Sequence, residues 1–328
     1  MSLEQEEETQ PGRLLGRSDA VPAFIEPNVR FWITERQSFI RRFLQWTELL
    51  DPTNVFISVE SIENSRQLLC TNEDASSPAS ADQRATVHPD SSNLIPPLFR
   101  PAAFLPFMAP TVFLSMMPLK GIKSVILPQV FLCAYMAAFN SINGNRSYTC
   151  KPLERSLLMA GAVASSTFLG VIPQFVQMKY GLTGPWIKRL LPVIFLAQAS
   201  GVNVYMSRSL ESIKGIAVMD KEGNVLGHSR IAGTKAVRET LASRIVLFGT
   251  SALIPEVFSY FFKRTQFFRK NPGSLWILKL SCTVLAMGLM VPFSFSIFPQ
   301  IGQIRYCSLE EKIQSPTEET EIFYHRGV

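Results

Sequence analysis

The stretch from Ser156 to Met178 constrains the fold of this chain more than any other. Its 23 residues lie between Arg155 and Lys179 and include no ionisable side chain. At about 1.5 Å of rise per residue, a helix of this length crosses the ~30 Å hydrocarbon core of a bilayer. A helix of the same length in water would carry a polar face, whereas Pro173 is tolerated where neighbouring helices satisfy the freed carbonyl. We interpret the stretch as a membrane-spanning helix.

Five more segments share this apolar, charge-poor character. Most of them are bounded by Lys or Arg, and helix lengths of about 18 to 25 residues suit a span with some tilt. We therefore expect an all-α polytopic membrane protein with five transmembrane helices, or six if Ser124–Asn145 crosses the bilayer fully instead of re-entering. Because every connecting loop is basic, the positive-inside rule orients the protein only weakly. The six segments are Pro101–Leu119, Ser124–Asn145, Ser156–Met178, Leu190–Ser207, Ile245–Phe262 and Leu280–Ile304.

The rest of the chain divides by composition. Residues 1–30 form an acidic N-terminus that we expect to be disordered, and they resemble neither a secretory signal nor a cleaved mitochondrial presequence. Residues 31–100 form a polar, partly helical region with a linker at 71–93, and residues 305–328 form a polar C-terminal tail. The transmembrane domain, residues 101–304, includes a polar loop at 208–244.

Local patterns predict structure within these polar parts. Phe39, Phe43 and Trp46 fall at near-helical spacing among arginines, which fits either a small helical domain or a helix lying on a membrane surface. The dipeptide Asp51-Pro52 ends this helix. Residues 216–227 are two short apolar runs around a glycine-containing turn, which predicts a β-hairpin. Residues 234–245 are then expected to be helical.

Composition excludes several classes of function. The five cysteines and three histidines form no CxxC pair and no metal-ligand spacing, so we expect no metal, no cofactor and no disulfide framework. The formal net charge of +6 suits loops that face anionic membrane lipid, and no basic–aromatic patch points to nucleic acid. No nucleophile–base spacing, phosphate loop or pair of carboxylates points to an enzyme.

Glu256 and Lys279 are the two charged residues inside the apolar portion. Glu256 lies six residues before the end of the fifth segment, and Lys279 lies just ahead of the sixth. In two antiparallel helices with a short connection, both groups would reach a similar depth, about 8–9 Å below the interface. Because an isolated charge there costs several kcal/mol, we predict an intramembrane ion pair. The alternative is that Lys279 extends to the headgroups and Glu256 stays protonated.

Short motifs spread over roughly residues 30–305 resemble a known family. They are Ser38-Phe39-Ile40, Asp51-Pro52, His88-Pro89-Asp90, Asn203 through Arg208 to Gly215-Ile216, Asp220-x-x-Gly-Asn-x-Leu-Gly, Ser243-Arg244-Ile245, Ile254-Pro255 and Phe298-Pro299-Gln300. In combination they resemble the sideroflexins, in a divergent form. The resemblance implies a multi-pass protein of the mitochondrial inner membrane with about five spanning helices. It also implies a link to the movement of serine and other small neutral amino acids, and to iron and haem homeostasis.

One polar signature of the family is altered in this chain. Where family members carry Trp-Gln-Trp and Asn-Gln-Ser, this chain has Leu132-Cys133-Ala134 and Met136-Ala137-Ala138. A carrier of zwitterionic amino acids needs donors for the carboxylate and acceptors for the ammonium group, and these replacements remove several such groups. The alternative role of each polar residue that is left is an interhelical hydrogen bond. The candidate substrate-binding residues are Asn140, Asn143, Asn145, Arg146 and Asn203, with Gln174 and Gln198 as further polar groups in the apolar segments.

Two hypotheses of function follow from the resemblance. The first is a carrier for a small neutral amino acid or related metabolite, and the eroded signature argues against serine as its cargo. The second is a non-transporting scaffold or assembly factor for respiratory complexes such as complex I, with links to iron homeostasis. The expected partners are membrane lipid and, for the two hypotheses respectively, a small neutral amino acid or respiratory-complex subunits and assembly factors.

Overall fold

The structure is a computed structural model of the whole chain. It describes residues 38–58, 60–62, 86–88, 94–117, 121–180, 184–221, 223–271, 273–310 and 321–327. Pro89, Asp90, Cys70, most of the expected linker at 71–93 and the expected disordered N-terminus at 1–30 lie outside the described residues.

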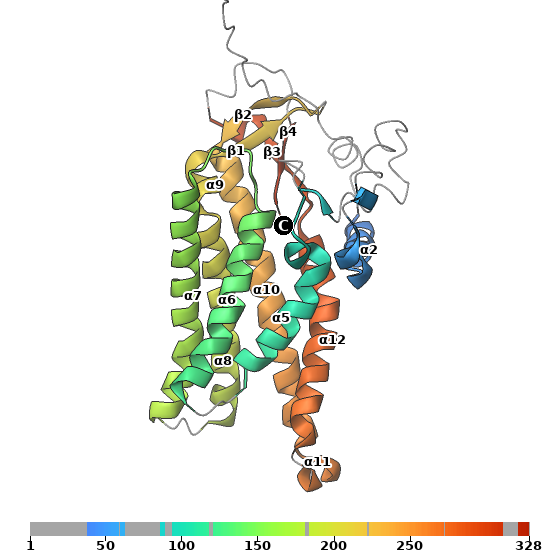
Figure 1. Cartoon of the computed structure of the whole chain (residues 1–328), viewed down its shortest axis with the longest axis vertical. Helices are drawn as coiled ribbons and strands as arrows, with labels where there is room; N and C mark the ends of the chain where they lie inside the picture. Colours follow the sequence, from blue (N-terminus) through green and yellow to red (C-terminus); the bar gives the residue numbers. More distant parts are fainter. Residues whose placement is uncertain are drawn as a thin grey trace, which may run out of the picture.

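Five long apolar helices form an elongated bundle (Figure 1). Among the described residues, these five are long and apolar enough to cross a membrane. This confirms the prediction of a polytopic all-α membrane protein. In the bundle, α7 packs on α6 and α8, while α10 packs on α8 and α12. The helices are α6 (Ile122–Asn143), α7 (Pro152–Tyr180), α8 (Pro185–Ser207), α10 (Arg230–Phe262) and α12 (Ser274–Ile297).

A sixth, shorter apolar helix, α5 (Pro101–Ser115), packs against α6 and α12. Its 15 residues cover only about 22 Å, less than the ~30 Å hydrocarbon core. Ser115 nevertheless reaches far along the bundle, because its carbonyl accepts a hydrogen bond of 2.5 Å from Gln174 Nε2, near the far end of α7. Of the six predicted apolar segments, the first, at 101–119, is therefore the one whose helix is too short to cross the hydrocarbon core. The segment at 124–145, for which re-entry was the alternative, instead forms the continuous 22-residue helix α6.

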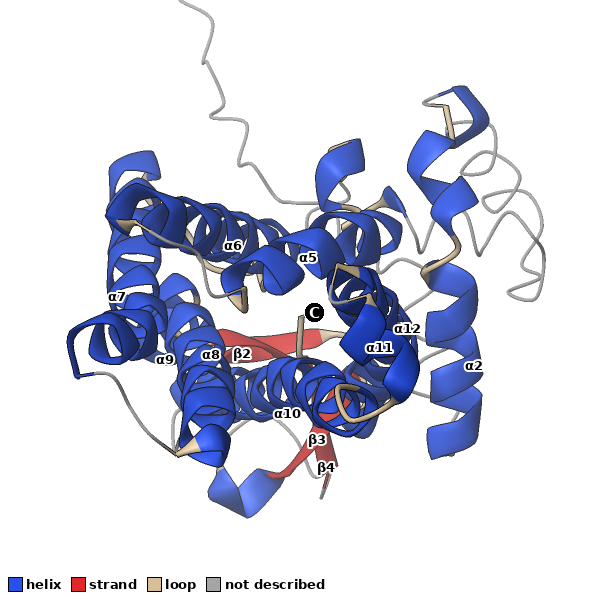
Figure 2. Cartoon of the chain, turned by 90° about the horizontal axis from the view of Figure 1, so that it is seen from below, coloured by secondary structure: helices blue, strands red, loops and turns tan. Residues whose placement is uncertain are grey.

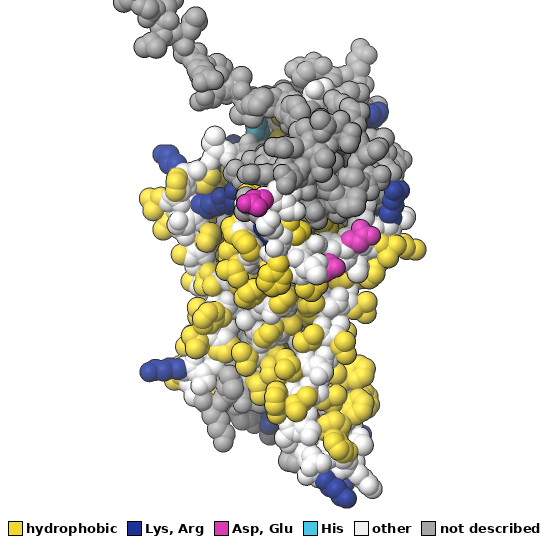
Figure 3. All heavy atoms as spheres, turned by 45° about the vertical axis from the view of Figure 1, so that its right-hand side comes forward, with side chains coloured by type: hydrophobic (Ala, Val, Ile, Leu, Met, Phe, Trp, Pro, Cys, Tyr) yellow, Lys and Arg dark blue, Asp and Glu magenta, His cyan; other side chains and the backbone are white. Residues whose placement is uncertain are grey.

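The helices bury one apolar core and expose a second apolar surface. Phe104, Leu132, Phe248 and Met287 are buried where α5, α6, α10 and α12 meet. Side chains that point outward are apolar as well, and Phe168 is 70% exposed. One face of the molecule accordingly shows a broad band of hydrophobic side chains, with Lys and Arg gathered toward the two ends (Figure 3). Such a surface suits lipid rather than water.

A small sheet covers one end of the bundle (Figure 1). Its strand order is β2-β1-β4-β3, and every pairing is antiparallel. The predicted hairpin corresponds to β1 and β2. Ile216, Ile304, Ile322 and Tyr324 form a second core between the sheet and the start of α10. The strands are β1 (Ile216–Met219), β2 (Val225–Ser229), β3 (Ile301–Arg305) and β4 (Glu321–His325).

Two boundaries differ from the sequence prediction. The expected helix at Leu280–Ile304 begins earlier, at Ser274, and ends at Ile297, because the residues after Phe298-Pro299 turn into strand β3. Residues 305–328 were predicted as a polar tail, but β4 pairs with both β1 and β3, and Arg326 is buried.

The expected polar loop at 208–244 is largely folded. Residues 209–214 form the short helix α9 (Ser209–Lys214), and α10 begins at Arg230, so that 15 residues of the expected loop belong to a continuous helix. Ser229 caps α10, since its side chain accepts a hydrogen bond of 3.1 Å from the Ala232 amide. The expected helical stretch at 234–245 lies inside α10. Within this stretch Arg244 is buried.

The N-terminal helix α2 (Phe39–Leu49) docks on the bundle. Arg42 Nε donates to the Ser296 carbonyl at 3.0 Å, and the Trp46 ring meets the Phe295 ring edge to face, with centroids 4.9 Å apart. The helix thus packs along α12. The remaining short elements are η1 (Pro52–Phe56), η2 (Pro97–Phe99), α11 (Gln266–Lys270) and η3 (Tyr306–Ser308).

Candidate functional site

Asn140 and Asn203 join helices α6 and α8 inside the bundle. Asn140 Nδ2 donates to Asn203 Oδ1 at 3.3 Å. Asn203 Nδ2 in turn donates to the Cys133 carbonyl and to Ser166 Oγ, both at 3.0 Å. Both asparagines are buried. A single wholly buried amide therefore ties α8 to α6 and α7, as expected for polar groups inside a bundle.

Asn143 and Asn145 lie where α6 ends, toward the sheet. Asn143 Nδ2 donates to the Phe99 carbonyl at 2.9 Å, which ties α6 to η2. The backbone N–H of Asn145 donates to Glu211 Oε1 at 3.1 Å, and its side-chain Nδ2 donates to the His325 carbonyl at 2.9 Å. Asn145 thus connects α6, α9 and β4, three parts of the chain that are far apart in sequence.

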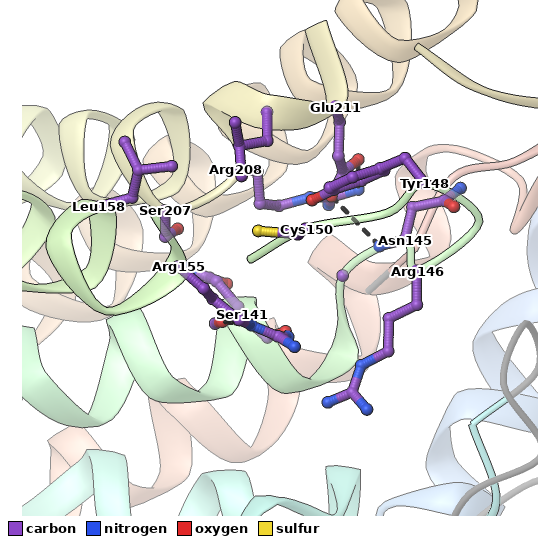
Figure 4. Close-up of a pocket in the computed structure, with 13 residues that line it drawn as sticks. Ser141, Asn145, Arg146, Tyr148, Cys150, Arg155, Leu158, Ser207, Arg208 and Glu211 are labelled. Atoms are coloured by element: carbon purple, nitrogen blue, oxygen red, sulfur yellow. Dashed lines mark hydrogen bonds and ion pairs between the residues drawn. The ribbon is translucent and has the colours of Figure 1, made fainter. Parts of the chain in front are cut away.

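A cavity of about 240 Å³ lies between the end of α6, the start of α7 and α9 (Figure 4). It gathers three of the predicted site residues, Asn140, Asn145 and Arg146. Asn143 and Asn203 lie outside it; Gln198 is exposed, and Gln174 is bonded to Ser115 near the far end of the bundle. The lining residues are Asn140, Ser141, Gly144, Asn145, Arg146, Tyr148, Cys150, Arg155, Leu158, Ser207, Arg208, Leu210 and Glu211.

The strongest electrostatic feature of the cavity wall is the pair Arg208–Glu211. Arg208 Nε and Nη2 donate to the two carboxylate oxygens of Glu211 at 2.7 and 2.6 Å, and Nη1 donates to Thr240 at 2.8 Å. Burial raises the pKa of the Tyr148 phenol, and the charge of Glu211 raises it further. Tyr148 is therefore a neutral hydrogen-bond donor at physiological pH.

Gly144 allows the Glu211 carboxylate to approach the end of α6. A Cβ at this position would lie 2.6 Å from the Asn140 carbonyl and 3.0 Å from Glu211 Oε1. Arg155, on the opposite wall, donates from Nε to Ser141 Oγ at 2.8 Å. The cavity therefore presents a carboxylate on one side and a guanidinium on the other (Figure 4).

His88 connects the family motif to this site. Its ring is buried, and Nε2 lies 2.8 Å from the Gly144 carbonyl. Since a carbonyl can only accept, Nε2 carries the proton in this contact. The first residue of His88-Pro89-Asp90 thus supports the loop that carries Gly144 and Asn145, while the other two lie outside the described residues.

At the opposite end of the bundle, the structure brings Glu256 and Lys279 together. Lys279 Nζ lies 2.5 Å from Glu256 Oε1, as the sequence argument anticipated. A third charge was not anticipated: Arg189 of α8 lies 3.6 Å from the other carboxylate oxygen. The Glu256 carboxylate on α10 therefore interacts with two cations, Lys279 of α12 and Arg189 of α8.

Several residues of the site were missed at the level of sequence. Arg208 and Glu211 fell within the predicted polar loop and were not named as site residues, yet each side chain is only 1% exposed. Their i, i+3 spacing is a helix-pair signal that could have indicated contact. Arg326 had no local signal, because its burial depends on the pairing of β4 with distant strands.

The comparison with known proteins identifies the family. The sequence profile described as Sideroflexins matches residues 27–328. This chain belongs to the sideroflexin family. It is 95% identical to human Sideroflexin-4 over the full length of both chains, and 64% identical to bovine Sideroflexin-4, with 93% of this chain and all of the relative covered. Human Sideroflexin-5 is 29% identical, with 95% of this chain and 94% of that relative covered.

Membership of the sideroflexin family indicates the broad functional class of this protein. The family is transporter-like rather than enzymatic, and the five long apolar helices make the protein a multi-pass membrane protein. The prediction of the family from scattered motifs is confirmed. No solved structure is similar to the chain at a significant level.

Proposed function

We propose that this sideroflexin is a mitochondrial inner-membrane carrier for a small neutral amino acid or a related metabolite. The observation that supports this most is the polar cavity beside Asn140. Its volume of about 240 Å³ is below the ~300–1,000 Å³ of sites for drug-sized ligands, which suits a small solute. Its walls carry both signs of charge within an otherwise apolar bundle, as a zwitterionic ligand requires.

The chemistry of the walls matches the two ends of an amino acid. Arg155 and Arg146 supply hydrogen-bond donors for a carboxylate, and Glu211 with the amide oxygen of Asn140 supplies acceptors for an ammonium group. Glu211 is already paired with Arg208 in two hydrogen bonds. An ammonium group would therefore share this carboxylate rather than displace the arginine, which favours small cargo without a charged side chain.

The test is uptake of labelled small neutral amino acids into proteoliposomes that contain the purified protein. Uptake is expected for at least one of these amino acids, and Asn140→Ala should reduce it at least tenfold. Gln198→Ala, which removes an exposed amide from α8, is the matched control and should leave uptake unchanged. An absence of uptake for the whole set, or equal uptake by wild type and Asn140→Ala, would contradict the proposal.

A second function is favoured by the positions where the family signature is altered. Leu132, Cys133, Met136 and Ala137 are buried, and the first three belong to the main hydrophobic core. Apolar packing thus fills positions where the resemblance to the family leads us to expect polar groups. This supports a scaffold or assembly factor for respiratory complexes such as complex I, with an indirect link to iron homeostasis. Co-purification of respiratory subunits from mitochondria, together with an absence of uptake, would favour this second function.

A further inference from the structure

Arg244 is a buried cation without a hydrogen-bonded partner. It lies on α10 and is 2% exposed, and none of its three guanidinium nitrogens has a hydrogen-bond acceptor in the part of the chain that the structure describes. The side chain is surrounded by three aromatic rings. Its Cζ lies 4.2 Å from the Phe295 centroid, 5.3 Å from that of Phe104 and 5.7 Å from that of Phe139.

The aromatic rings do not compensate for the missing acceptors. A cation above a ring is attracted weakly compared with the cost of burying a charge without a counter-ion. The five N–H groups of a guanidinium also need acceptors, which a ring face does not supply in the plane of the group. A side chain in this state is a candidate for binding an anion that the protein chain does not itself provide.

The surroundings of Arg244 add positive rather than negative charge. Arg326 and Arg208 are both buried within electrostatic range of Arg244. Arg326 Nη2 donates to the Phe295 carbonyl at 3.0 Å, on the residue whose ring faces Arg244, while Arg326 Nε and Nη1 have no acceptor among the described residues. Burial lowers the pKa of Arg326 to about 10, although Glu239 acts to raise it, so Arg326 stays charged at neutral pH.

The charge balance leaves one cation unmatched. Arg208 is neutralised by Glu211 through two hydrogen bonds. Arg326 is attracted by Glu239, whose carboxylate also accepts a hydrogen bond from the Tyr324 hydroxyl at 3.2 Å. Arg244 remains. One added negative charge would therefore balance Arg208, Arg244 and Arg326 against Glu211 and Glu239, and Arg42, which also acts on Arg326, would add to the attraction of an anion.

We propose that Arg244 and Arg326 form a binding site for the carboxylate of a small organic acid, enclosed by α5, α6, α10 and α12. The planar fork of a guanidinium matches the two oxygens of a carboxylate, and the rings of Phe104, Phe139 and Phe295 shape an apolar wall around it. Figure 2 shows these four helices around the middle of the bundle, where the last described residues also lie.

This site is separate from the cavity beside Asn140. Phe139 faces Arg244, whereas its neighbour Asn140 lines the cavity, and successive residues of a helix point about 100° apart. Arg244 is not among the cavity residues. The site goes beyond the proposed function, because it requires binding of an anion and not its transport.

The test measures thermal unfolding of the full-length protein in phosphatidylcholine nanodiscs, with acetate as the probe. Acetamide, which has a similar shape and no charge, and chloride at equal ionic strength are the reference solutes. Acetate is expected to raise the Tm by about 2 to 4 °C more than either reference. Equal Tm values in all three solutes would overturn the proposal.

Variants separate a ligand site from a structural role. Arg244→Gln should abolish the acetate-dependent shift and also raise the Tm without acetate, because it removes an unpaired buried charge. Arg244→Lys should keep the charge but lose most of the shift, since a lysine does not present the guanidinium fork. Arg238→Gln, on an exposed position of the same helix, should leave the shift intact. If Arg244→Gln lowers the Tm and the acetate shift persists, the arginine is structural and the proposal fails.

A further arm of the experiment distinguishes a lipid phosphate from a free carboxylate as the source of the anion. Nanodiscs with phosphatidylglycerol test a lipid phosphate: if they stabilise the wild type but not Arg244→Gln, and acetate adds nothing, the site belongs to lipid and the proposal is overturned. Because the proposal concerns binding and not transport, an absence of uptake in proteoliposomes would contradict the proposed function but not these binding results.

Discussion

Arg208 and Glu211 form a fork-to-fork ion pair with bonds of 2.7 and 2.6 Å, in a position where both side chains are only 1% exposed. Glu211→Gln would leave Arg208 as a buried cation with a neutral partner, and we expect it to destabilise the protein by about 3 to 5 kcal/mol. The measurement is thermal unfolding in detergent, which should show a marked fall in Tm.

Glu154→Gln is the matched control for this change. Glu154 also pairs with a cation, Lys214 at 2.7 Å, but these side chains are 44% and 31% exposed. Exposed pairs contribute little to stability because water and salt screen them, so this variant should behave nearly as the wild type. Similar losses for Glu211→Gln and Glu154→Gln would show that the buried pair has no special role.

The three-charge cluster at the other end of the bundle can be dissected with a double-mutant cycle. Glu256→Gln should be more destabilising than Lys279→Gln, because it leaves both Lys279 and Arg189 without their carboxylate. The double variant should be less destabilised than the sum of the two single changes, with a coupling of about 0.5 to 3 kcal/mol. Additive losses in thermal unfolding would mean that the two residues do not interact.

Glu310 gives the sheet end of the protein a pH dependence. Its carboxylate accepts hydrogen bonds from the amides of Arg230 and Ile231 at 2.7 and 3.1 Å, and so caps α10. Burial alone would raise the pKa of Glu310, but the hydrogen bonds from Ser229 and these amides outweigh it and lower the pKa below 4.5. The stabilisation is therefore present above pH 4.5 and is lost as the pH falls through the lowered pKa.

The check is the difference in Tm between wild type and Glu310→Gln as a function of pH. At neutral pH the variant should be less stable by about 0.5 to 1 kcal/mol, as for other helix caps. The two proteins should converge as the pH falls through the lowered pKa of Glu310. A difference that stays constant down to the lowest pH at which the protein remains folded would contradict the role of the charged carboxylate.

Gly144→Ala tests the close approach of Glu211 to the end of α6. The backbone of Gly144 has a negative φ, so alanine adds no backbone strain and its effect is steric. We expect a loss of about 1 to 3 kcal/mol, as for other overpacked positions. Gly273→Ala is the control, because a Cβ there meets nothing within 4 Å. Equal unfolding temperatures for the two variants would argue against the tight contact.

Sequence reasoning was most successful where the bilayer dictates composition. The run at Ser156–Met178 lies within a 29-residue helix, and the depth argument for Glu256 and Lys279 placed two residues of different helices side by side. Both inferences depend on helix rise and on the cost of charge in lipid, which are local properties of the chain. The same rules could not detect Arg189 as the third member, because the position of α8 beside α10 depends on packing.

The prediction differed most from the structure where charged residues are frequent. Residues 208–244 contain many Lys and Arg, which indicated a polar loop, yet Arg208 and Arg244 are buried and α10 begins at Arg230. The partners that make this burial possible, such as Thr240 and the carbonyl of Arg326, are distant in sequence or common in any helix. Burial of a charged residue therefore depended on tertiary contacts that a single sequence does not reveal.

The central place of β4 in the sheet imposes an order on biogenesis. β1 pairs with β4 on one side, and β4 is made only after α10 and α12 have been synthesised. Until then, one edge of β1 keeps unpaired amides and carbonyls, the kind of edge to which foreign strands can add. Any stage at which β4 has not yet joined the sheet thus leaves this edge of β1 open to a chaperone or a partner strand.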